Sequence, residues 1–227
     1  MDKTSILTRL QAILGPVGVL HRPQDVALYE YDGALDKARP DFVVFPETAQ
    51  QVAAVVQVAN ATGLPFMPRG AGTGLSGGAV AIEGGIVVSF ARMNQILDID
   101  LANQRATVQP GVVNIDVTNA VSGDGFYYVP DPSSQRACTI GGNIAENSGG
   151  PHCLAYGVTA NHTLTLEVVL PDGEIVDLGL PTADPPGYDL TGLMVGSEGT
   201  LGLVTEAVVR RCICQRRSQP CWPCSTT

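Results

Sequence analysis

The sequence is short of charge, and of positive charge above all. Charged residues make up 15% of the 227 residues, and 13 lysines and arginines stand against 22 aspartates and glutamates, for a formal net charge of −9. The basic residues are spread singly over most of the chain, so they form no patch for nucleic acid or anionic lipid. A polyanionic partner is therefore disfavoured, although backbone N–H groups can still bind a small anion without any lysine.

Long apolar runs are also lacking. No segment approaches the length needed to cross a bilayer, so direct membrane insertion is not expected. The start, MDKTSILTRLQAILGP, has an acidic residue at position 2 and charges that interrupt its apolar residues, unlike a secretory signal. We expect a cytoplasmic protein.

Cysteine is scarce except at the C-terminal end. Cys138 and Cys153 stand alone in the body of the chain, as is typical of a reduced cytosolic protein, whereas four others crowd the end: Cys212, Cys214, Cys221 and Cys224. A zinc site there is conceivable, but the group lacks the usual ligand spacings and any histidine, so no metal is expected.

The pattern of the first half predicts helices alternating with strands. Apolar residues at helical spacing predict a helix over 4–14 with a threonine cap, and Thr48 with Gln51 forms a capping box before a helix that Gly63 ends. A short helix within 21–34 and strands over 41–46, 64–68 and 84–90 complete this half.

The second half is predicted to be richer in strands. Residues 96–101 and 105–110 form one predicted hairpin and 163–179 another, with Pro171, Asp172 and Gly173 in its turn. A helix is expected over 113–122, a loop from 130 to 150, and a short helix, a glycine turn and a final strand over 188–210.

The stretch PRGAGTGLSGG, residues 68–78, is dense in glycine. Such a run indicates left-handed backbone or a ligand pressed against the main chain. Gly72, Gly74 and Gly77 match G-x-G-x-x-G, but a dinucleotide-binding Rossmann turn must open a helix, and the GGAVAIEGGIVVSF that follows has no helical periodicity. An empty surface turn and a nest for a pyrophosphate remain as alternatives.

Three further segments contain small residues where a core would have large ones. They are YVPDPSS at 128–134, CTIGGNIAENSGGP at 138–151 and VGSEGTLGLVTEA at 195–207. Because four such loops occur in one chain, we expect a single extended ligand that is contacted along its length.

These motifs resemble those of the vanillyl-alcohol oxidase and p-cresol methylhydroxylase (PCMH) family. The resemblance runs from about residue 39 to 210 and is nearest to the FAD subunit of glycolate oxidase and the D-lactate and D-2-hydroxyglutarate dehydrogenases. It implies an α+β fold, an FAD-binding PCMH-type domain of two α/β subdomains with the FAD between them. The expected domains are an N-terminal helical segment (1–37), the FAD-binding domain (38–211) and a disordered Cys/Arg-rich tail (212–227).

The resemblance also assigns cofactor-binding residues. The glycine loop would cradle the pyrophosphate, the second and third segments would line the flavin and its ribityl chain, and the last would close the nucleotide end. The residues are Arg69, Gly70, Ala71, Gly72, Thr73, Gly74, Ser76, Gly77, Pro130, Asp131, Ser133, Thr139, Gly142, Asn143, Ala145, Asn147, Gly150, Glu198, Gly199, Gly202 and Val204.

Noncovalent FAD is expected, because no histidine lies in or beside the glycine loop. His152 and Cys153 follow the last glycine segment, but a loop histidine and a packed thiol are the commoner explanations. No histidine among His21, His152 and His162 is marked as a base, so no catalytic residue is assigned.

The implied function is oxidation of a 2-hydroxy acid, glycolate or D-lactate, by hydride transfer to FAD. In the resembling enzymes a substrate-binding half follows this domain, whereas here the chain turns into CICQRRSQPCWPCSTT, so we expect a truncated or frame-shifted product that is inactive alone. A non-catalytic flavin subunit of a complex is the alternative. Expected partners are FAD and other oxidase subunits, including an iron-sulfur subunit. A UDP-N-acetylenolpyruvoylglucosamine reductase and an NAD-binding protein are less favoured.

Overall fold

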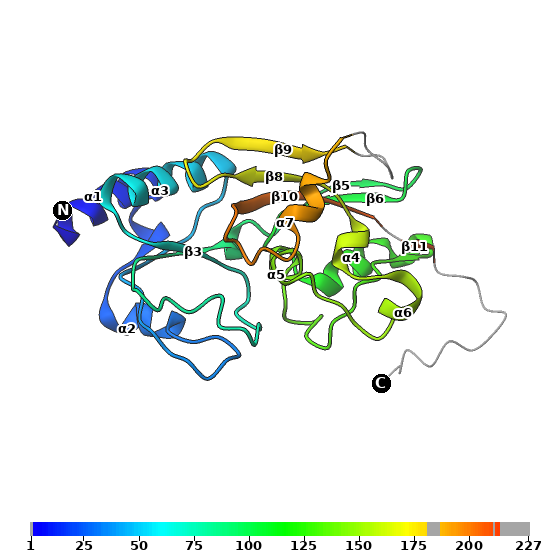
Figure 1. Cartoon of the computed structure of the whole chain (residues 1–227), viewed down its shortest axis with the longest axis horizontal. Helices are drawn as coiled ribbons and strands as arrows, with labels where there is room; N and C mark the ends of the chain where they lie inside the picture. The colour runs from blue at the N-terminus through cyan, green and yellow to red at the C-terminus, as the bar shows by residue number, and fades with distance from the viewer. Residues whose placement is uncertain (1, 181–186, 211, 214–227) are drawn as a thin grey trace.

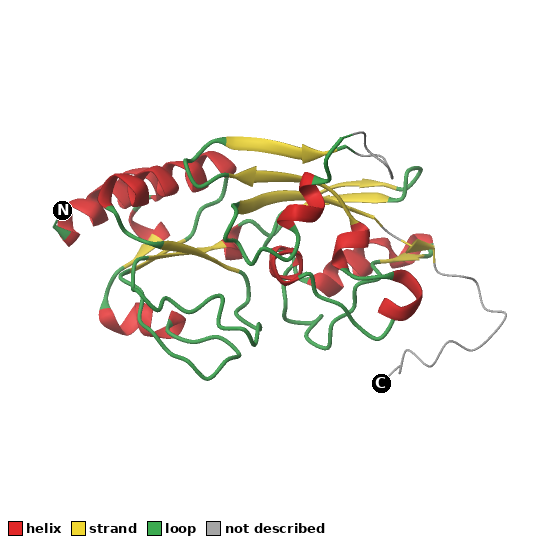
Figure 2. Ribbon diagram, viewed as in Figure 1, coloured by secondary structure: helices red, strands yellow, loops and turns green. Residues whose placement is uncertain are grey.

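The computed structural model describes residues 2–180, 187–210 and 212–213. Two subdomains lie side by side, the first coloured blue to cyan and the second mainly green to orange (Figure 1). Each combines a sheet with helices (Figure 2). The predicted α+β fold of two α/β subdomains is confirmed.

The first subdomain is built on a four-stranded sheet with the strand order β1-β2-β4-β3. The strands are β1 (Val19–Leu20), β2 (Phe42–Val44), β3 (Phe66–Arg69) and β4 (Ile86–Ser89). β2 and β3 each run parallel to β4 between them, and β1 is antiparallel to β2. All residues of β2 and β4 are buried, as expected for the centre of a parallel sheet covered on both faces.

Helix α3 (Ala49–Thr62) covers one face of this sheet. Val52, Val55, Val56 and Ala59 recur at helical spacing and are fully buried. Oγ1 of Thr48 accepts from N–H of Gln51, but Oε1 of Gln51 accepts from N–H of Glu47, so the predicted capping box is only half formed. Gly63 ends the helix in the left-handed conformation, with φ of 68°.

The N-terminal segment belongs to this subdomain. Helix α1 (Lys3–Leu14) packs on α3, β1 joins the sheet, and α2 (Pro23–Val26) follows. The predicted threonine cap of α1 is wrong, because the N-cap residue is Asp2 and Thr4 lies inside the helix. Residues on the two sides of the expected boundary at residue 37 are therefore in contact.

The second subdomain carries a five-stranded antiparallel sheet with the order β5-β6-β10-β8-β9. Its strands are β5 (Ile96–Asp100), β6 (Arg105–Val108), β8 (Thr163–Val169), β9 (Ile175–Gly179) and β10 (Leu203–Arg210). Both predicted hairpins, β5–β6 and β8–β9, are confirmed, and N–H of Gly173 donates to the Leu170 carbonyl in the β8–β9 turn.

Helices α4 (Asn114–Val121), α5 (Ile140–Glu146), α6 (Cys153–Tyr156) and α7 (Leu190–Met194) accompany this sheet. The prediction that residues 130–150 form one loop is wrong for α5. Its sequence, IGGNIAE, contains two glycines that weaken the helical pattern, yet Thr139 caps it and Ile140 and Ile144 are fully buried. Tertiary packing therefore outweighs the low helix propensity.

An apolar core joins the two subdomains. Val169 of β8 and Leu203 of β10 belong to the same buried cluster as the inner face of α3, together with Phe90 and Met93 between the sheets. A second cluster lies between the five-stranded sheet and α4 and α5. This shared cluster fixes the distance between the two subdomains.

The C-terminal end of the described chain adds a small strand pair. β11 (Cys212–Ile213) is antiparallel to β7 (Phe126–Tyr127), so the first two residues of the predicted tail pair with the second subdomain. The rest of the expected tail, including its other cysteines, lies outside the described residues. 3₁₀ turns occur at Pro16–Gly18, Ala27–Tyr29, Phe90–Arg92, Ser122–Asp124 and Thr159–His162. Over the described ranges no helix is both long and apolar enough to cross a bilayer.

Three carboxylates form a row across the five-stranded sheet. Glu206 of β10 pairs with Glu167 of β8, which in turn pairs with Asp177 of β9. Partial burial raises the pKa of Glu206, and the charges of Glu167 and Asp177 raise it further. Like charges placed directly opposite each other on neighbouring strands destabilise a sheet.

We expect Glu206→Gln to raise the melting temperature at pH 7 by roughly 1–3 °C, because it removes one of three adjacent negative charges. A carboxyl whose pKa is raised by folding lowers the free energy of unfolding as pH rises from its unfolded pKa, about 4.3, through its folded pKa. The gain should therefore shrink towards pH 4. Thermal unfolding at both pH values measures it.

The matched control is Glu174→Gln, which removes the same charge from an exposed position beside the β8–β9 turn. A control that stabilises as much as Glu206→Gln, or a gain from Glu206→Gln that is equal at both pH values, would contradict the explanation.

Candidate functional site

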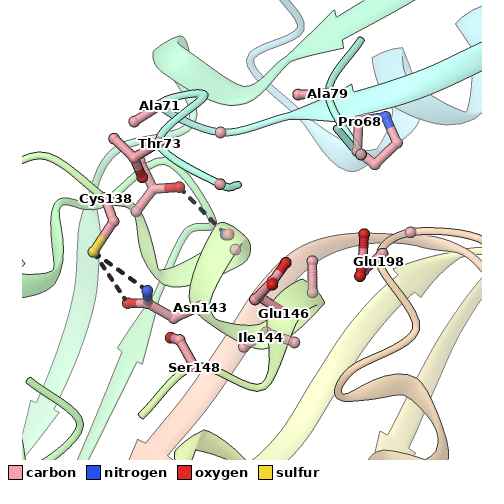
Figure 3. A pocket seen from close by; sticks show the side chains of 18 of the residues that line it. Pro68, Ala71, Thr73, Ala79, Cys138, Asn143, Ile144, Glu146, Ser148 and Glu198 are labelled. Atoms are coloured by element: carbon pink, nitrogen blue, oxygen red, sulfur yellow. Dashed lines mark hydrogen bonds between the residues drawn. The ribbon is translucent and has the colours of Figure 1, made fainter. Parts of the chain in front are cut away.

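A cavity of about 420 Å³ lies between the two subdomains, within the size range of ligand pockets. Its walls come from the glycine loop (residues 70–79), from α5 with the segment before it, and from the loop between α7 and β10. Figure 3 shows Ala71 and Thr73 of the glycine loop on one side, Asn143 and Glu146 on α5, and Glu198 on the third wall. Segments far apart in sequence therefore converge on one space.

Both ends of the glycine loop are anchored. Nη1 of Arg69 donates to the Ala79 carbonyl at 3.4 Å, and N–H of Ala79 donates to Oδ2 of Asp32 at the same distance. N–H of Gly33 donates to the Gly74 carbonyl at 2.9 Å. The segment around Asp32 thus holds the loop in place, and Asp32 itself lines the cavity.

Between these anchors the backbone donors of the loop are free. None of the N–H groups from Ala71 to Gly78 donates to another group of the described residues. Gly72 and Gly77 have positive φ values of 71° and 79°, which break the extended chain and suit glycine. Successive N–H groups in such a loop form a concave surface for an anion.

The N-terminus of α5 offers no comparable donors. N–H of Ile140 donates to the Val112 carbonyl at 2.9 Å, N–H of Gly141 to the Pro110 carbonyl at 2.8 Å, and N–H of Gly142 to Oγ1 of Thr139 at 3.3 Å. The N–H groups of the first turn are therefore already paired within the protein. The glycine loop itself leads into β4 and not into a helix, which counts against a Rossmann turn.

The third wall is docked on the end of α5. N–H of Gly196 donates to the Ile144 carbonyl at 2.8 Å, and N–H of Glu198 to the Ala145 carbonyl at 2.9 Å. Glu198 has a φ of 52°, a conformation that is uncommon for a residue other than glycine. The backbone of this loop is therefore bent so that the Glu198 carboxylate lies beside Gly78 of the glycine loop.

The charged groups at the cavity are acidic. Asp32, Glu146 and Glu198 line it, and among the described lining residues there is no lysine, arginine or histidine. Oγ of Ser76 donates to Oε1 of Glu146 at 3.0 Å, which links the glycine loop to α5. A ligand for this cavity must carry groups that accept from backbone N–H and groups that donate to carboxylates.

A positive charge lies directly behind the glycine loop, because the guanidinium of Arg69, a residue that is 7% exposed, packs against Gly72. Burial lowers the pKa of this guanidinium, while Asp32, Tyr29 and Tyr31 raise it. Arg69 lies over the ring of Tyr29, with its guanidinium carbon 5.5 Å from the ring centre. Since an arginine remains charged in proteins, it adds positive potential behind the loop without lining the cavity.

Fifteen of the residues predicted to bind the cofactor line this one cavity. The structure therefore brings together residues from the glycine loop, the 133–145 region and the 198–204 loop. They are Gly70, Ala71, Gly72, Thr73, Gly74, Ser76, Ser133, Thr139, Gly142, Asn143, Ala145, Glu198, Gly199, Gly202 and Val204.

Six predicted residues do not line it: Arg69, Gly77, Pro130, Asp131, Asn147 and Gly150. Asp131 accepts from Nδ1 of His152 at 2.6 Å, and its carboxylate packs tightly against Gly150. Asn147 ends α5 with a φ of 53°, and its Oδ1 accepts from N–H of Ala160 at 3.0 Å. These residues shape the segments that reach the cavity.

Sequence reasoning missed two kinds of lining residue. The carboxylates of Asp32 and Glu146 reach the cavity only through the fold, since nothing near them in sequence marks them. Apolar walls come from Phe90, Ile144, Met194 and Leu203, which look like core positions in the sequence. Glu146, Ile144 and Leu203 do lie within segments that the sequence analysis singled out, but nothing in those segments marks these particular side chains as lining residues.

None of the histidines lines the cavity. His21 is exposed, His162 is buried with burial lowering its pKa, and His152 pairs with Asp131 at the surface. Within the described ranges there is no group of three or more histidine, cysteine or acidic side chains placed to hold a metal ion. The chemistry offered by the described cavity is therefore binding through amides, hydroxyls and carboxylates.

Comparisons with known proteins find relatives both in sequence and in structure. The sequence model of a family described as FAD binding domain matches residues 40–179. Glycolate oxidase subunit GlcD of Escherichia coli K12 is 46% identical over 211 residues, which cover 92% of this chain and 42% of that protein. D-lactate dehydrogenase of Anaerostipes hadrus is 44% identical over 175 residues, covering 77% of this chain and 37% of that protein.

Solved structures show the same fold. An alkyldihydroxyacetonephosphate synthase superimposes with a TM-score of 0.82 at 24% identity, covering 94% of this chain and 44% of that chain. The chain thus spans less than half the length of the relatives it matches.

Glycine is required at some positions of the loop and not at others. A methyl group at Gly70 would collide with Oγ1 of Thr139, which caps α5, whereas one at Gly74 would meet no atom within 4 Å. We expect Gly70→Ala to lower the free energy of unfolding by about 1–3 kcal/mol and Gly74→Ala to change it by less than about 0.5 kcal/mol.

Urea unfolding of the ligand-free protein measures both values. Equal effects of the two substitutions would show that the contact between the glycine loop and Thr139 does not constrain the loop.

Proposed function

The chain belongs to the FAD binding domain family, with FAD as its cofactor, and we propose that it is the FAD-binding part of an oxidoreductase that oxidises 2-hydroxy acids such as glycolate or D-lactate. The names of its relatives support the substrate class. The fifteen predicted residues that line the cavity would hold the cofactor.

The observation that carries the proposal is the row of free N–H groups from Ala71 to Gly78 at the edge of the cavity. FAD contains a pyrophosphate, and a loop of neutral donors can hold this group without a basic side chain. The buried hydroxyl oxygen of Ser148, which lines the same cavity, has no partner among the described residues. Free donors and an unpaired hydroxyl are what a polar ligand would satisfy.

The carboxylates fit the other groups of the same cofactor. FAD carries ribose and ribityl hydroxyls, which donate hydrogen bonds to carboxylate oxygens. Glu198 lines the third wall of the cavity and is proposed for this role, whereas the carboxylate of Glu146 on α5 already accepts from Ser76 (Figure 3). The mixture of donors on one wall and acceptors on the other matches a ligand with both phosphates and hydroxyls.

Bound FAD supplies an acceptor for the hydride that leaves the carbinol carbon of a hydroxy acid. The residues of this chain bind and orient the cofactor and shield it from water through Phe90, Ile144, Met194 and Leu203. The hydroxyl proton of the substrate needs a base, and the side chains of the described cavity lining that could accept a proton are carboxylates and one thiol. We infer that residues beyond this domain supply the base and the substrate contacts, because the chain spans less than half the length of its relatives.

We propose that FAD is bound noncovalently. Cys138 is the one described lining residue with a side chain of the kinds used for flavin attachment. The residue is 4% exposed, and its thiol accepts from Nδ2 of Asn143. A thiol that is packed and hydrogen-bonded in this way is poorly placed to react.

Other oxidase subunits are proposed as partners, supported by the name of the relatives, glycolate oxidase subunit GlcD. The further proposal that one of them is an iron-sulfur subunit rests on the family resemblance alone. A cytoplasmic location is proposed as well, supported by Cys138 and Cys153, which are both free thiols. A non-catalytic flavin-binding subunit is the second candidate, favoured by the absence of a histidine from the described cavity lining.

The test is flavin content followed by turnover. We expect the purified chain to show a flavin absorption spectrum and to release FAD on acid precipitation, or to take up FAD on titration, with no response to NAD. A folded, monodisperse protein that neither contains nor takes up FAD would overturn the proposal. Reduction by glycolate or D-lactate of the chain alone would show a complete site, whereas bound FAD without turnover until partners are added favours the second candidate.

We expect Glu146→Gln to tighten FAD binding by about two- to fivefold, because it removes a negative charge near the proposed pyrophosphate site while its amide oxygen can still accept from Ser76. The dissociation constant is measured by flavin fluorescence titration at low salt. Glu174→Gln is the control for net charge, and the advantage of Glu146→Gln should decrease at 0.5 M salt. Weaker binding by Glu146→Gln would assign its charge to a ligand contact instead.

A further inference from the structure

A chain of buried amides connects the backbone behind the cavity with the cavity wall. Asn114, the first residue of α4, is 1% exposed, and Asn143 of α5 is 3% exposed. Nδ2 of Asn114 donates to the Pro130 carbonyl at 2.9 Å and to Oδ1 of Asn143 at 2.8 Å. Asn114 does not line the cavity, whereas Asn143 does.

The Pro130 carbonyl fixes the orientation of both amides. A carboxamide has an oxygen and a nitrogen of nearly equal shape, but a carbonyl can only accept, so the Asn114 atom next to Pro130 must be the nitrogen. The same nitrogen faces Asn143, whose nearest atom must then be the acceptor oxygen. The nitrogen of Asn143 is thereby placed on the opposite side of its amide.

This nitrogen is directed to the cavity wall. Nδ2 of Asn143 donates to Sγ of Cys138 at 3.3 Å, and both residues line the cavity (Figure 3). An amide nitrogen carries two hydrogens, and no second acceptor for it is found among the described residues. The unpaired hydroxyl of Ser148 lies on the same wall, since N–H of Ser148 donates to the Asn143 carbonyl at 3.0 Å.

We propose that Asn114 is a positioning residue that holds the Asn143 amide so that Nδ2 presents a hydrogen-bond donor to an acceptor atom of bound FAD. The acceptor is a carbonyl oxygen or a ring nitrogen, chemistry that both the flavin ring and the adenine ring offer. The proposal rests on FAD binding in this cavity and is independent of the hydroxy-acid substrate.

The arrangement discriminates between ligands that offer a hydrogen-bond acceptor at this position and ligands that do not. A buried donor left without an acceptor loses its hydration and gains nothing in return, so a ligand lacking an acceptor here binds more weakly. Because Asn114 has both of its partners in the protein, it fixes this preference without contacting the ligand. This donor is lost if either amide is flipped, or if either is replaced by a carboxylate.

Two aspartate substitutions separate positioning from folding. Asn143→Asp keeps an acceptor for Asn114 and puts oxygen where the donor was. Asn114→Asp cannot donate to the Pro130 carbonyl and makes Asn143 turn its nitrogen away from the cavity. We expect each variant to raise the FAD dissociation constant by about tenfold or more. The double variant should raise it by less than the product of the two single effects, because both substitutions remove the same donor.

The control is Asn119→Asp, which adds the same charge at an exposed position of α4. Fluorescence and calorimetric titrations with FAD, riboflavin and ADP are compared with the melting temperature of each ligand-free variant. The loss should appear for riboflavin or for ADP but not for both, which identifies the ring that supplies the acceptor. A general loss of structure would weaken binding of both fragments.

If Asn114→Asp does not fold, Asn143→Asp alone decides the matter, since its bond to Asn114 is preserved. The proposal is overturned if a folded Asn143→Asp binds FAD as tightly as the unmodified chain. It is also overturned if Asn119→Asp weakens FAD binding as much, or if riboflavin and ADP affinities fall together.

Discussion

The structure of this site depends on backbone donors that the protein itself leaves unpaired. From Ala71 to Gly78 the glycine loop gives its N–H groups no partner among the described residues, although the loop is anchored at Arg69, Asp32 and Ala79. Anchoring at the ends limits the conformational entropy that binding has to remove. A flexible glycine segment is thereby turned into a fixed set of donors.

The remaining architecture keeps the opposing wall at the right separation. The cluster shared by α3, Val169 and Leu203 holds the two sheets together, and the first turn of α5 is docked on Pro110 and Val112. The same helix then supports the 196–199 loop through carbonyls at its C-terminal end. Because α5 contacts both neighbouring segments, this helix of seven residues positions two walls of the cavity.

The sequence predicted those elements whose local pattern agrees with their tertiary setting. Helix α3 and the hairpins β5–β6 and β8–β9 have clear periodicity and turn residues, whereas α5 was missed because its glycines oppose a helix that packing stabilises. At the site, glycine density and the family resemblance located most of the lining. Asp32, Glu146 and the Asn114–Asn143 pair could not be found in this way, since their roles arise from contacts between distant segments.

An acidic chain can hold an anionic cofactor because the binding groups are neutral. The net charge of −9 and the carboxylates of Glu146 and Glu198 oppose a phosphate at long range, but hydrogen bonds from several N–H groups act at contact distance. The carboxylates then favour ligands that also carry hydroxyl donors over simple phosphates. A row of amide donors combined with nearby negative charges therefore suits a ligand that carries both phosphates and hydroxyls better than a simple inorganic anion.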